Sequence, residues 1–470
     1  MPLLRIICPL FLFPVSVSVS AQSFAPPPES PGGYFNKFQN FVYNEPNSDS
    51  AYYYAHRLAS NPKYLSYLDD LIHKNFAQSF IEYPVQESKN PDSVRRRSEF
   101  YKTILKHLRT DTSAMMQQTI RPMSLWIAAQ DNRKNTPELR KIVKDFAESQ
   151  LIGDLYANSA GRYGLLISSI LSENPEMKPE NEKLFSEIYS KLEKGQVVLS
   201  DTAQSADLER RAWYRFLFAY VNNLKANQAI IPAEKEKYLK EAFNYSPDLV
   251  DRRVYSAYFY DMMFLYKGEE ISGFKTEYVD YLLSSSSDHQ KTLDLFLEAS
   301  LIEPAYKEKL RDYYTKINMS STGFNQYWQN AIDAKANAPV NVSIRQLDKT
   351  VFSTMQQHGK WVLIDFWGTW CLPCRAEHPQ LQKFYDSLVL LNPSKISLLT
   401  VACKDTEAKV SSYMKEKRYS FTVAMSDGKI EYTYPVEGYP TKILITPAGK
   451  FLTIPYGIDW VSFIKQYANL

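Results

Sequence analysis

The sequence predicts a large α-helical region followed by a smaller α/β domain with a mixed central sheet. In residues 34–336, apolar side chains recur at helical spacing in one segment after another, and strand-like alternation is rare. After residue 337, short apolar runs alternate with helical segments, and a hairpin and a final helix close the chain. The 470 residues suffice for both parts, since a domain usually needs about 100–200 residues.

The helical pattern is clearest in three segments of the first region. Residues 206–225 and 304–317 each place aromatic and leucine side chains on one face. A third helix is expected over residues 246–268, with Ser246 as its N-terminal cap and Gly268 at its end. These segments predict a series of packed helices.

Residues 213–247 carry a Trp, Tyr, Ala and Pro pattern that is weakly similar to a tetratricopeptide unit. No second copy follows at the spacing of about 34 residues that such an array needs. We therefore expect an irregular all-α region rather than a repeat array. Its many tyrosines are interpreted mainly as core residues.

The α/β domain is expected to contain four strand-forming segments separated by helices. Its apolar runs suit buried strands, and the hairpin is expected to turn at Pro447-Ala448-Gly449. The expected elements are a strand over 340–344, a strand over 360–367, a helix over 374–388, a strand over 396–403, a helix over 406–418, a hairpin over 441–457 and a helix over 459–470.

The N-terminus has the features of a secretory signal peptide. A positive charge at Arg5 precedes an apolar stretch, and small residues lead to a cleavage site after Ala21. Prolines interrupt this stretch, which is shorter than the roughly 20 apolar residues of a membrane anchor. The predicted organisation is a signal peptide over 1–21, a Pro/Gly/Ser-rich linker over 22–33, an all-α region over 34–336 and the α/β domain over 337–470.

The charge balance gives no support for a nucleic-acid partner. The chain has 55 basic and 52 acidic residues, a formal net charge of +3, and no dense basic stripe. Its 44% hydrophobic and 23% charged residues are typical of ordinary globular domains.

Cleavage after Ala21 would remove Cys8 and leave Cys371, Cys374 and Cys403. The first two form a Cys-x-x-Cys motif, which a structural disulfide, half of a zinc site or a redox centre would each explain. A structural disulfide would close a very small loop, and the nearby histidines lack zinc-ligand spacing, so no metal is expected. In an oxidising compartment the motif favours redox chemistry. Cys403 is expected to be an inert buried thiol; a third redox cysteine and an intermolecular disulfide are the alternatives.

Two sequence stretches carry a specific resemblance. "WVLIDFWGTWCLPCRAEHP" has Trp370 before the cysteine pair, Pro373 inside it and Pro379 in the following helix, and "VEGYPTKILI" follows downstream. In this context the α/β domain, from about Ala338 to Leu470, resembles the exported thiol–disulfide oxidoreductases of the TlpA/ResA type, which have the thioredoxin fold. The helical region resembles no family that we recognise.

The residues of the motif suit thiol–disulfide exchange. Cys371 falls at the start of a predicted helix, where backbone N–H groups and the helix dipole stabilise a thiolate. Cys374 lies one turn further and would attack the mixed disulfide once a base has removed its proton. Asp365, on an apolar strand, is one candidate base, although a charged strand end is the alternative. Glu377 is the second candidate, because the resemblance places a glutamate there that is tied to thiol reactivity; a solvated helix residue is the alternative.

The resemblance also implies a substrate-binding surface. Pro440 is expected to be cis and to pack beside the cysteines, which leaves the backbone of Tyr439 free to pair with a substrate strand. Trp370 and Pro373 complete this surface, although packing and cover of the site is the alternative role for Trp370.

The expected function is therefore an exported thiol–disulfide oxidoreductase of the bacterial cell envelope or periplasm, soluble or peripheral. The resemblance favours a reductase of protein disulfides that needs no cofactor and is itself reduced by an unidentified membrane electron donor. A disulfide oxidase or isomerase is the first alternative. The second is a helical binding protein or chaperone with an accessory redox domain. In the reductase interpretation the helical region would recruit a protein partner.

Overall fold

The computed structural model describes residues 29–470 except 82–90, 198–204, 249–250, 252–255, 269–272 and 437. The predicted signal peptide and most of the predicted linker lie outside the described residues. No helix in the described part of the chain is long and apolar enough to cross a membrane.

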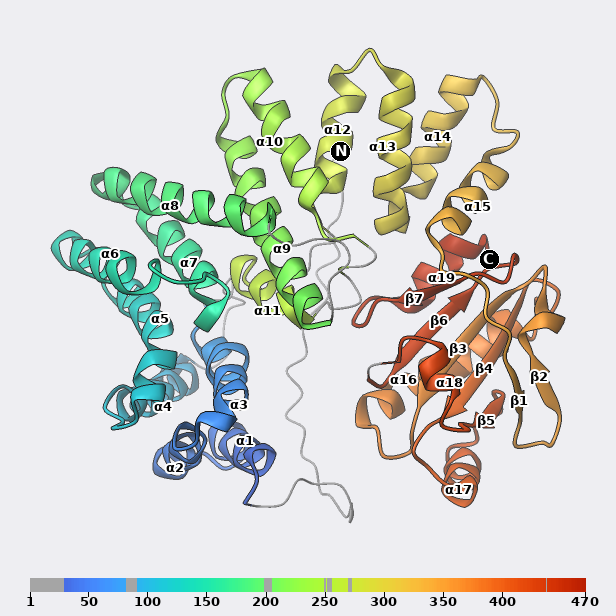
Figure 1. Cartoon of the computed structure of the whole chain (residues 1–470), viewed down its shortest axis with the longest axis horizontal. Coiled ribbons are helices and arrows are strands. Elements are labelled where there is room, and N and C mark those ends of the chain that lie inside the picture. Colours follow the sequence, from blue (N-terminus) through green and yellow to red (C-terminus); the bar gives the residue numbers. More distant parts are fainter. Residues whose placement is uncertain are drawn as a thin grey trace. The chain divides into compact units, whose positions relative to one another are not determined.

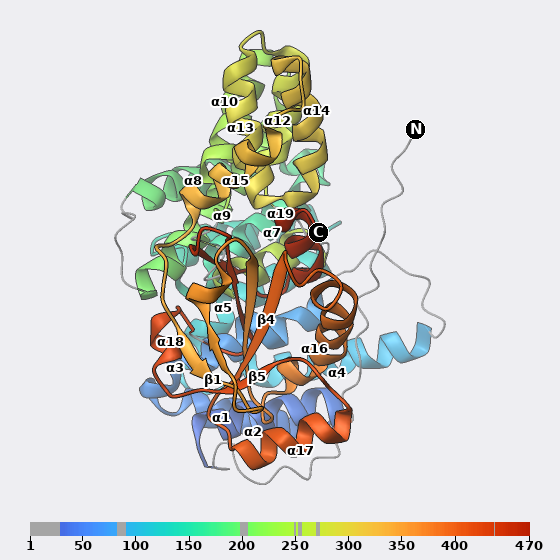
Figure 2. The same cartoon turned by 90° about the vertical axis from the view of Figure 1, so that its right-hand side faces the viewer.

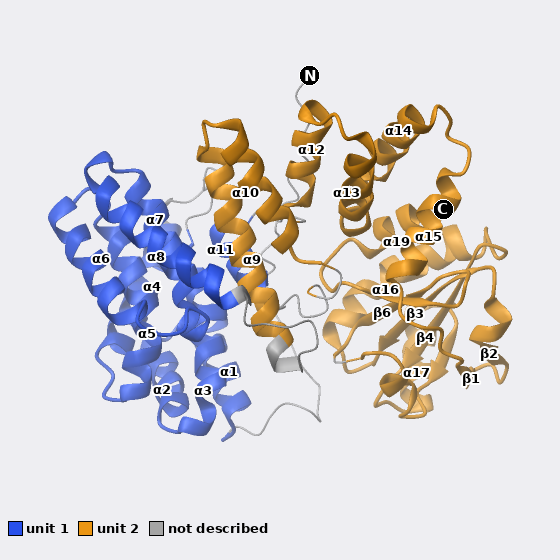
Figure 3. Ribbon diagram, turned by 45° about the horizontal axis from the view of Figure 1, so that its top comes forward, with its two compact units in different colours: residues 1–199, 258–271 blue, residues 200–257, 272–470 orange. Residues whose placement is uncertain are grey.

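The described residues before position 336 form helices joined by turns and short loops, and the chain divides into two compact units (Figures 1 and 3). Unit 1 comprises residues 1–199 and 258–271, and unit 2 comprises residues 200–257 and 272–470. The helices that lie wholly or mostly in unit 1 are α1 (Pro31–Gln39), α2 (Ser48–Ala59), α3 (Leu65–Asp69), α4 (Pro91–Arg109), α5 (Ala114–Asp131), α6 (Thr136–Gln150), α7 (Ala160–Ser172), α8 (Lys178–Val197) and α11 (Ser256–Leu265). Those of unit 2 before the sheet are α9 (Ser205–Gln228), α10 (Pro232–Tyr245), α12 (Lys275–Ser285), α13 (His289–Ile302), α14 (Lys307–Asn318) and α15 (Phe324–Lys335).

The predicted helices agree with this arrangement, with one correction. Helix α9 covers the segment expected over 206–225, and α14 begins three residues later than expected, after a short 3-10 turn. Ser246 does not cap a new helix: it ends α10, and its hydroxyl accepts a hydrogen bond from Phe274 N at 2.9 Å. Residues 249–250 and 252–255 of the third predicted helix lie outside the described residues, and its described part, α11, ends at Leu265. In the turn that follows, Lys267 and Gly268 both have positive φ, and Gly268 N donates to the Met263 carbonyl at 2.8 Å.

The α/β domain is built on a five-stranded mixed sheet of order β5-β4-β3-β6-β7. β3, β4 and β5 are parallel, whereas β6 pairs antiparallel with both β3 and β7, as in a thioredoxin-like fold. The strands are β3 (Trp361–Trp367), β4 (Ile396–Ala402), β5 (Val423–Met425), β6 (Thr441–Ile445) and β7 (Phe451–Ile454), with β1 (Ser343–Arg345) and β2 (Val351–Ser353) as a separate pair. The helices are α16 (Leu372–Phe384), α17 (Glu407–Lys417), α18 (Ile430–Thr433) and α19 (Trp460–Ala468).

The predicted mixed sheet is therefore confirmed, and its long central strands lie where the apolar runs predicted them. The sequence analysis missed β2, β5 and α18, which have only three or four residues each. Elements this short repeat the hydrophobic period at most once, which is too little for a pattern to stand out.

Alternate residues of the strands pack on opposite faces of the sheet. Leu363 and Leu444 belong to the core beneath α16 and α19, whereas Ile364 and Ile443 belong to the core that includes Ile430 of α18. Figure 2 shows α16 and α18 on opposite sides of the sheet. Side chains of odd-numbered residues in β3 therefore lie under α16, which is the face that concerns the cysteine pair.

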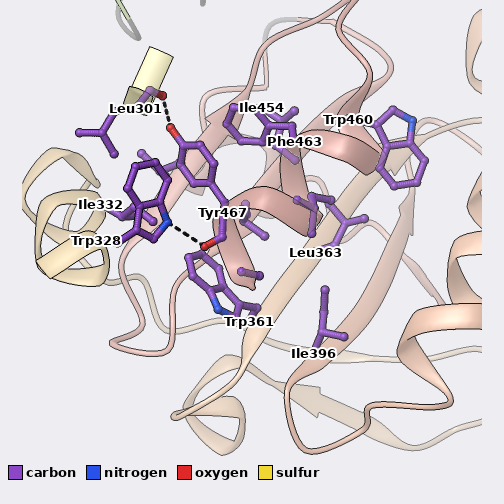
Figure 4. Packing of buried hydrophobic residues seen from close by; sticks show 14 of the residues in the cluster. Leu301, Trp328, Ile332, Trp361, Leu363, Ile396, Ile454, Trp460, Phe463 and Tyr467 are labelled. Carbon is purple, nitrogen blue, oxygen red and sulfur yellow. Dashed lines mark hydrogen bonds between the residues drawn. The ribbon is translucent and has the colours of Figure 1, made fainter. Parts of the chain in front are cut away.

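The core under α16 continues into the last helices before the sheet (Figure 4). Trp328 of α15 is fully buried, and its indole N–H donates to the Tyr467 carbonyl at 3.2 Å. The Tyr467 hydroxyl in turn donates to the carbonyl of Leu301 in α13. The change from helical to α/β structure falls near residue 337 as predicted, but the hydrophobic core is continuous across it. We expect residues 338–470 to fold on their own, and this stays a prediction.

Candidate redox site

The cysteine pair lies where the central strand β3 passes into helix α16. Cys371 is the N-cap of α16, and its sulfur accepts a hydrogen bond from Cys374 N at 3.2 Å. The two cysteines form a disulfide with a Cα–Cα distance of 5.3 Å, and they are only 4% and 1% exposed. The helix N-terminus supplies a positive electrostatic potential at Cys371 Sγ, which favours a thiolate after reduction.

The loop before the cysteines holds Trp370 over the site. The indole N–H donates to the Cys403 carbonyl at 3.1 Å, and the ring remains 45% exposed. Gly368 permits this position, because a Cβ there would lie 2.4 Å from the indole nitrogen. Thr369 N also donates to Asp405 Oδ2 at 2.6 Å and ties the loop to the residues after β4.

The predicted proline loop lies at the same end of the sheet as the cysteine pair, where β3 ends and β6 begins. The Tyr439–Pro440 bond is cis, and β6 begins directly after it, with Thr441 opposite Phe366 near the end of β3. The Tyr439 and Trp370 rings contact each other edge to face, with centroids 5.4 Å apart. Pairing of β6 with β3 thus brings together two motifs that are separated in the sequence. Pro373 lies in the first turn of α16, between the cysteines.

Both candidate bases contact one lysine that the sequence analysis did not single out. Asp365 is 2% exposed on β3 and lies directly opposite Lys442 in β6. Lys442 Nζ is 3.0 Å from Asp365 Oδ1 and also donates to Glu377 Oε2 on α16. Asp365 is therefore a buried ion-pair member rather than a charged strand end, and Glu377 is tied to the same cluster.

Burial and neighbouring charges shift the pKa values of Asp365 and Lys442 in opposite directions. Burial raises the pKa of Asp365, and the ammonium of Lys442 only partly opposes this effect. Burial lowers the pKa of Lys442, but the carboxylates of Asp365 and Glu377 outweigh it, so the net pKa is raised. Lys442 is thus a permanent cation, while Asp365 is a carboxyl that accepts a proton more readily than an exposed aspartate.

His378, four residues after Cys374 on α16, faces the protein interior. Its side chain is fully buried, its Nδ1 lies 2.9 Å from the Tyr413 hydroxyl, and its ring packs edge-on against Trp367 at 4.5 Å. Burial lowers its pKa to about 4, so the imidazole is neutral at physiological pH. His378 therefore lies on the inner face of α16, against Trp367 and Tyr413.

Cys403 is a free, fully buried cysteine at the end of β4. Its thiol donates to the Val401 carbonyl at 3.4 Å, and burial raises its pKa. A buried neutral thiol is a poor nucleophile. This position favours the expected inert role, and its backbone carbonyl serves the site by holding Trp370. In the part of the chain that the structure describes, no group of three or more His, Cys, Asp or Glu residues is placed to hold a metal ion.

Comparisons with known proteins show what the C-terminal domain is similar to. Residues 329–452 match the AhpC/TSA family, which places the match on the C-terminal α/β domain. That domain has a thioredoxin-like fold and is similar in sequence to thiol–disulfide oxidoreductases, while the helical region lies almost wholly outside the match.

The homologues are ResA-like. Thiol-disulfide oxidoreductase ResA of Bacillus subtilis strain 168 is 32% identical over 113 residues, which cover 24% of this chain and 62% of that protein. ResA of Oceanobacillus iheyensis is 26% identical over 138 residues, which cover 29% of this chain and 70% of that protein. The chain thus spans less than two thirds of the Bacillus subtilis protein.

Solved structures also align with the C-terminal part. The pneumococcal exposed lipoprotein thioredoxin Etrx1 from Streptococcus pneumoniae is 24% identical, with 28% of this chain and all of that chain covered and a TM-score of 0.25. The thioredoxin domain of a thiol-disulfide oxidoreductase from Bacteroides vulgatus is 22% identical, with 28% and 98% covered and a TM-score of 0.26.

Proposed function

We propose that this protein is an exported thiol–disulfide oxidoreductase that reduces protein disulfides in the bacterial cell envelope. The observation that carries the proposal is the Cys371–Cys374 disulfide at the N-terminus of α16, in a domain that also has a cis Tyr439–Pro440 bond and a buried Asp365 on β3. The N-terminal signal-peptide pattern supports export, and the pair of thiols supports two-electron exchange without a cofactor.

The reaction balances without any further group at the site. In the reduced protein, the Cys371 thiolate attacks a substrate disulfide, forms a mixed disulfide and releases the first substrate thiolate. Cys374 loses its proton to a nearby carboxylate, attacks Cys371 Sγ and releases the second substrate thiolate. The substrate gains two electrons, and the protein is left with the Cys371–Cys374 disulfide. An external dithiol, which we propose to belong to a membrane electron donor, must then reduce that disulfide.

The direction of this exchange is tested by the reduction potential of the cysteine pair. Thioredoxin has a potential of about −270 mV and the strong oxidant DsbA about −120 mV. We expect a value near the thioredoxin end, measured by equilibrating the protein with defined thiol–disulfide buffers. A value near −120 mV would instead assign the protein to disulfide oxidation, and an intermediate value with disulfide-shuffling activity to isomerisation.

The native substrates are identified by trapping. Cys374→Ala leaves Cys371 able to form a mixed disulfide that cannot be resolved, so substrate proteins should stay attached in cells. The double variant Cys371→Ala with Cys374→Ala is the matched control, because it keeps the fold and lacks the nucleophile. Equal capture by both variants would refute the nucleophilic role of Cys371.

We further propose that the helical region recruits protein partners. Tyr43, Tyr53 and Tyr67 are 44%, 51% and 42% exposed in unit 1, and tyrosine is enriched at protein interfaces. Replacing the three by serine should slow reduction of a trapped native substrate and leave reduction of insulin unchanged. Tyr456→Ser, at an exposed tyrosine of the α/β domain, is the control. Unchanged rates on both substrates would leave the helical region as an independent binding module.

A further inference from the structure

Lys442 connects the two carboxylates that compete for the role of base. Its ammonium lies 3.0 Å from Asp365 Oδ1 and also donates to Glu377 Oε2. The lysine side chain is 7% exposed and that of Asp365 is 3% exposed, whereas Glu377 is 31% exposed. Two acids therefore share one buried cation, and the three charges sum to −1 when all are ionised.

The rest of the sheet supplies no competing charge. The residue paired with Asp365 on its other side is Thr400 of β4, and the residue paired with Lys442 on its other side is Ile454 of β7. From α19, the aromatic ring of Trp460 lies 5.2 Å from Lys442 Nζ. None of these neighbours titrates, so the cluster's proton balance is set by its own members and by α16.

Helix α16 contributes the remaining titratable and charged groups. Apart from Glu377 and the cysteines, these are Arg375, which lies 6.0 Å from the Tyr413 ring centroid, the neutral His378, and Lys383 in the last turn. Cys374 is 1% exposed in the same hydrophobic core as Trp361, Leu363 and Trp367 of β3, which flank Asp365 on that face of the strand. Glu377 lies three residues after Cys374 on α16, so the carboxylates held by Lys442 lie on the same side of the sheet as Cys374.

We propose that Lys442 is a positioning residue that makes Asp365 and Glu377 a single proton acceptor for the resolving cysteine. When Cys374 attacks Cys371 Sγ, its proton passes to one of the two carboxylates while the other remains ionised and keeps the buried ammonium paired. With a single carboxylate, the same protonation would leave a buried cation unpaired, which is strongly unfavourable. This inference rests on the proposed thiol–disulfide exchange and assigns its second step.

The variants of this cluster have different expected effects. Without the ammonium, in Lys442→Met, both carboxylates hold their protons to higher pH, so the pH at which the resolving step reaches half its maximal rate should rise by about one unit or more. In Glu377→Gln the remaining Asp365 stays ionised to lower pH, because protonation would leave Lys442 unpaired. Asp365 is then a weaker base, so the step should be slower and its midpoint lower. Lys442→Arg keeps the charge and should resemble the parent protein.

The experiment resolves the two thiol attacks in time. The full chain carries Cys8→Ser and Cys403→Ser, so that Cys371 and Cys374 are its only thiols. After reduction it is mixed with dithiobis(nitrobenzoate), a chromogenic disulfide. The attack by Cys371 releases one thionitrobenzoate, and the attack by Cys374 releases a second. The rate of the second release is followed against pH in the parent and in each variant. Glu407→Gln, at an exposed glutamate that pairs with Lys349 on the surface, is the control for loss of a carboxylate.

The expected result is a second-release midpoint at least about one pH unit higher in Lys442→Met than in the parent, with recovery in Lys442→Arg, no shift in Glu407→Gln, and a first release that changes less than the second. Identical second-release pH curves for the parent and Lys442→Met would overturn the inference, since a purely structural lysine alters stability and not this midpoint. If Lys442→Met does not fold, Glu377→Gln decides: a slower release with a lower midpoint supports the shared acceptor, and an unchanged curve refutes it. A parent protein that releases fewer than two thionitrobenzoates would refute the proposed function itself.

Discussion

Trp328→Ala should destabilise the redox domain even though the residue lies in the helical region. Trp328 is fully buried in α15, and its indole packs edge-on against the ring of Tyr467 in α19 at 5.7 Å. The substitution opens a cavity between these elements and removes the hydrogen bond to the Tyr467 carbonyl. The perturbation therefore acts on the core that α15 and the α/β domain share.

The magnitude follows from the size of the buried side chain. Replacing a fully buried tryptophan by alanine costs about 3–5 kcal/mol, because the lost transfer free energy and the cavity add together. Typical domains have a free energy of unfolding of about 5–15 kcal/mol, so this loss is a large fraction of the total. With a urea dependence of about 1–3 kcal/mol per molar, the unfolding midpoint should fall by at least about 1 M.

Cys403 provides a site-specific assay for this effect. In the oxidised protein carrying Cys8→Ser it is the single free thiol, and it is buried in the core on the far face of the sheet. Short pulses of an alkylating reagent at increasing urea concentration report the unfolding of the α/β domain and not that of the helices. Trp126→Ala, at a buried tryptophan of unit 1, is the matched control.

An unchanged Cys403 labelling midpoint in Trp328→Ala would contradict the shared core. The α/β domain would then be stable without α15, as the predicted boundary at residue 337 supposes. If the midpoint falls in Trp328→Ala and not in Trp126→Ala, a fragment of residues 273–470 should be more stable and more soluble than one of residues 338–470. That comparison would place the boundary of independent folding before α12.

Three further predictions concern single groups. In the reduced protein, Cys371 should be alkylated fastest, with a pKa below the ordinary value of about 8.5; titration at that ordinary value would argue against a redox role. Burial lowers the pKa of His378 to about 4 in the folded protein, so between pH 6.5 and 4 only the unfolded chain binds the proton. The free energy of unfolding should therefore fall as the pH falls through this range. His378→Phe should flatten this fall in urea titrations at different pH values. Burial lowers the pKa of Lys307 to about 8 in the folded protein, so above pH 8 the unfolded chain holds its proton longer and the free energy of unfolding should rise towards the ordinary lysine pKa. Lys307→Met should remove this rise. An equal rise in the variant would assign it to other groups.

The sequence determined the features of this protein that depend on local pattern. Buried strands and amphipathic helices have periods of two and 3.6 residues, so β3, β4, β6, α16 and α19 were visible as patterns. The cysteine spacing and the residues around Cys371 indicated the chemistry, because a helix N-terminus stabilises a thiolate wherever the chain places it. The cis bond at Pro440 was expected from the resemblance, and the structure has it.

Only the tertiary structure decided which residues, distant in the sequence, form an ion pair or pack in one core. Lys442 is a single charged residue in an apolar strand, and nothing local in "TKILI" shows that it contacts Asp365 on a neighbouring strand and Glu377 on the helix above. That contact follows from the antiparallel register of β3 and β6, which is set by the whole sheet. The packing of Trp328 against Tyr467 is likewise fixed by the docking of two helices that are far apart in the sequence. Hydrophobic periodicity shows that a side chain is buried, but it does not show what buries it.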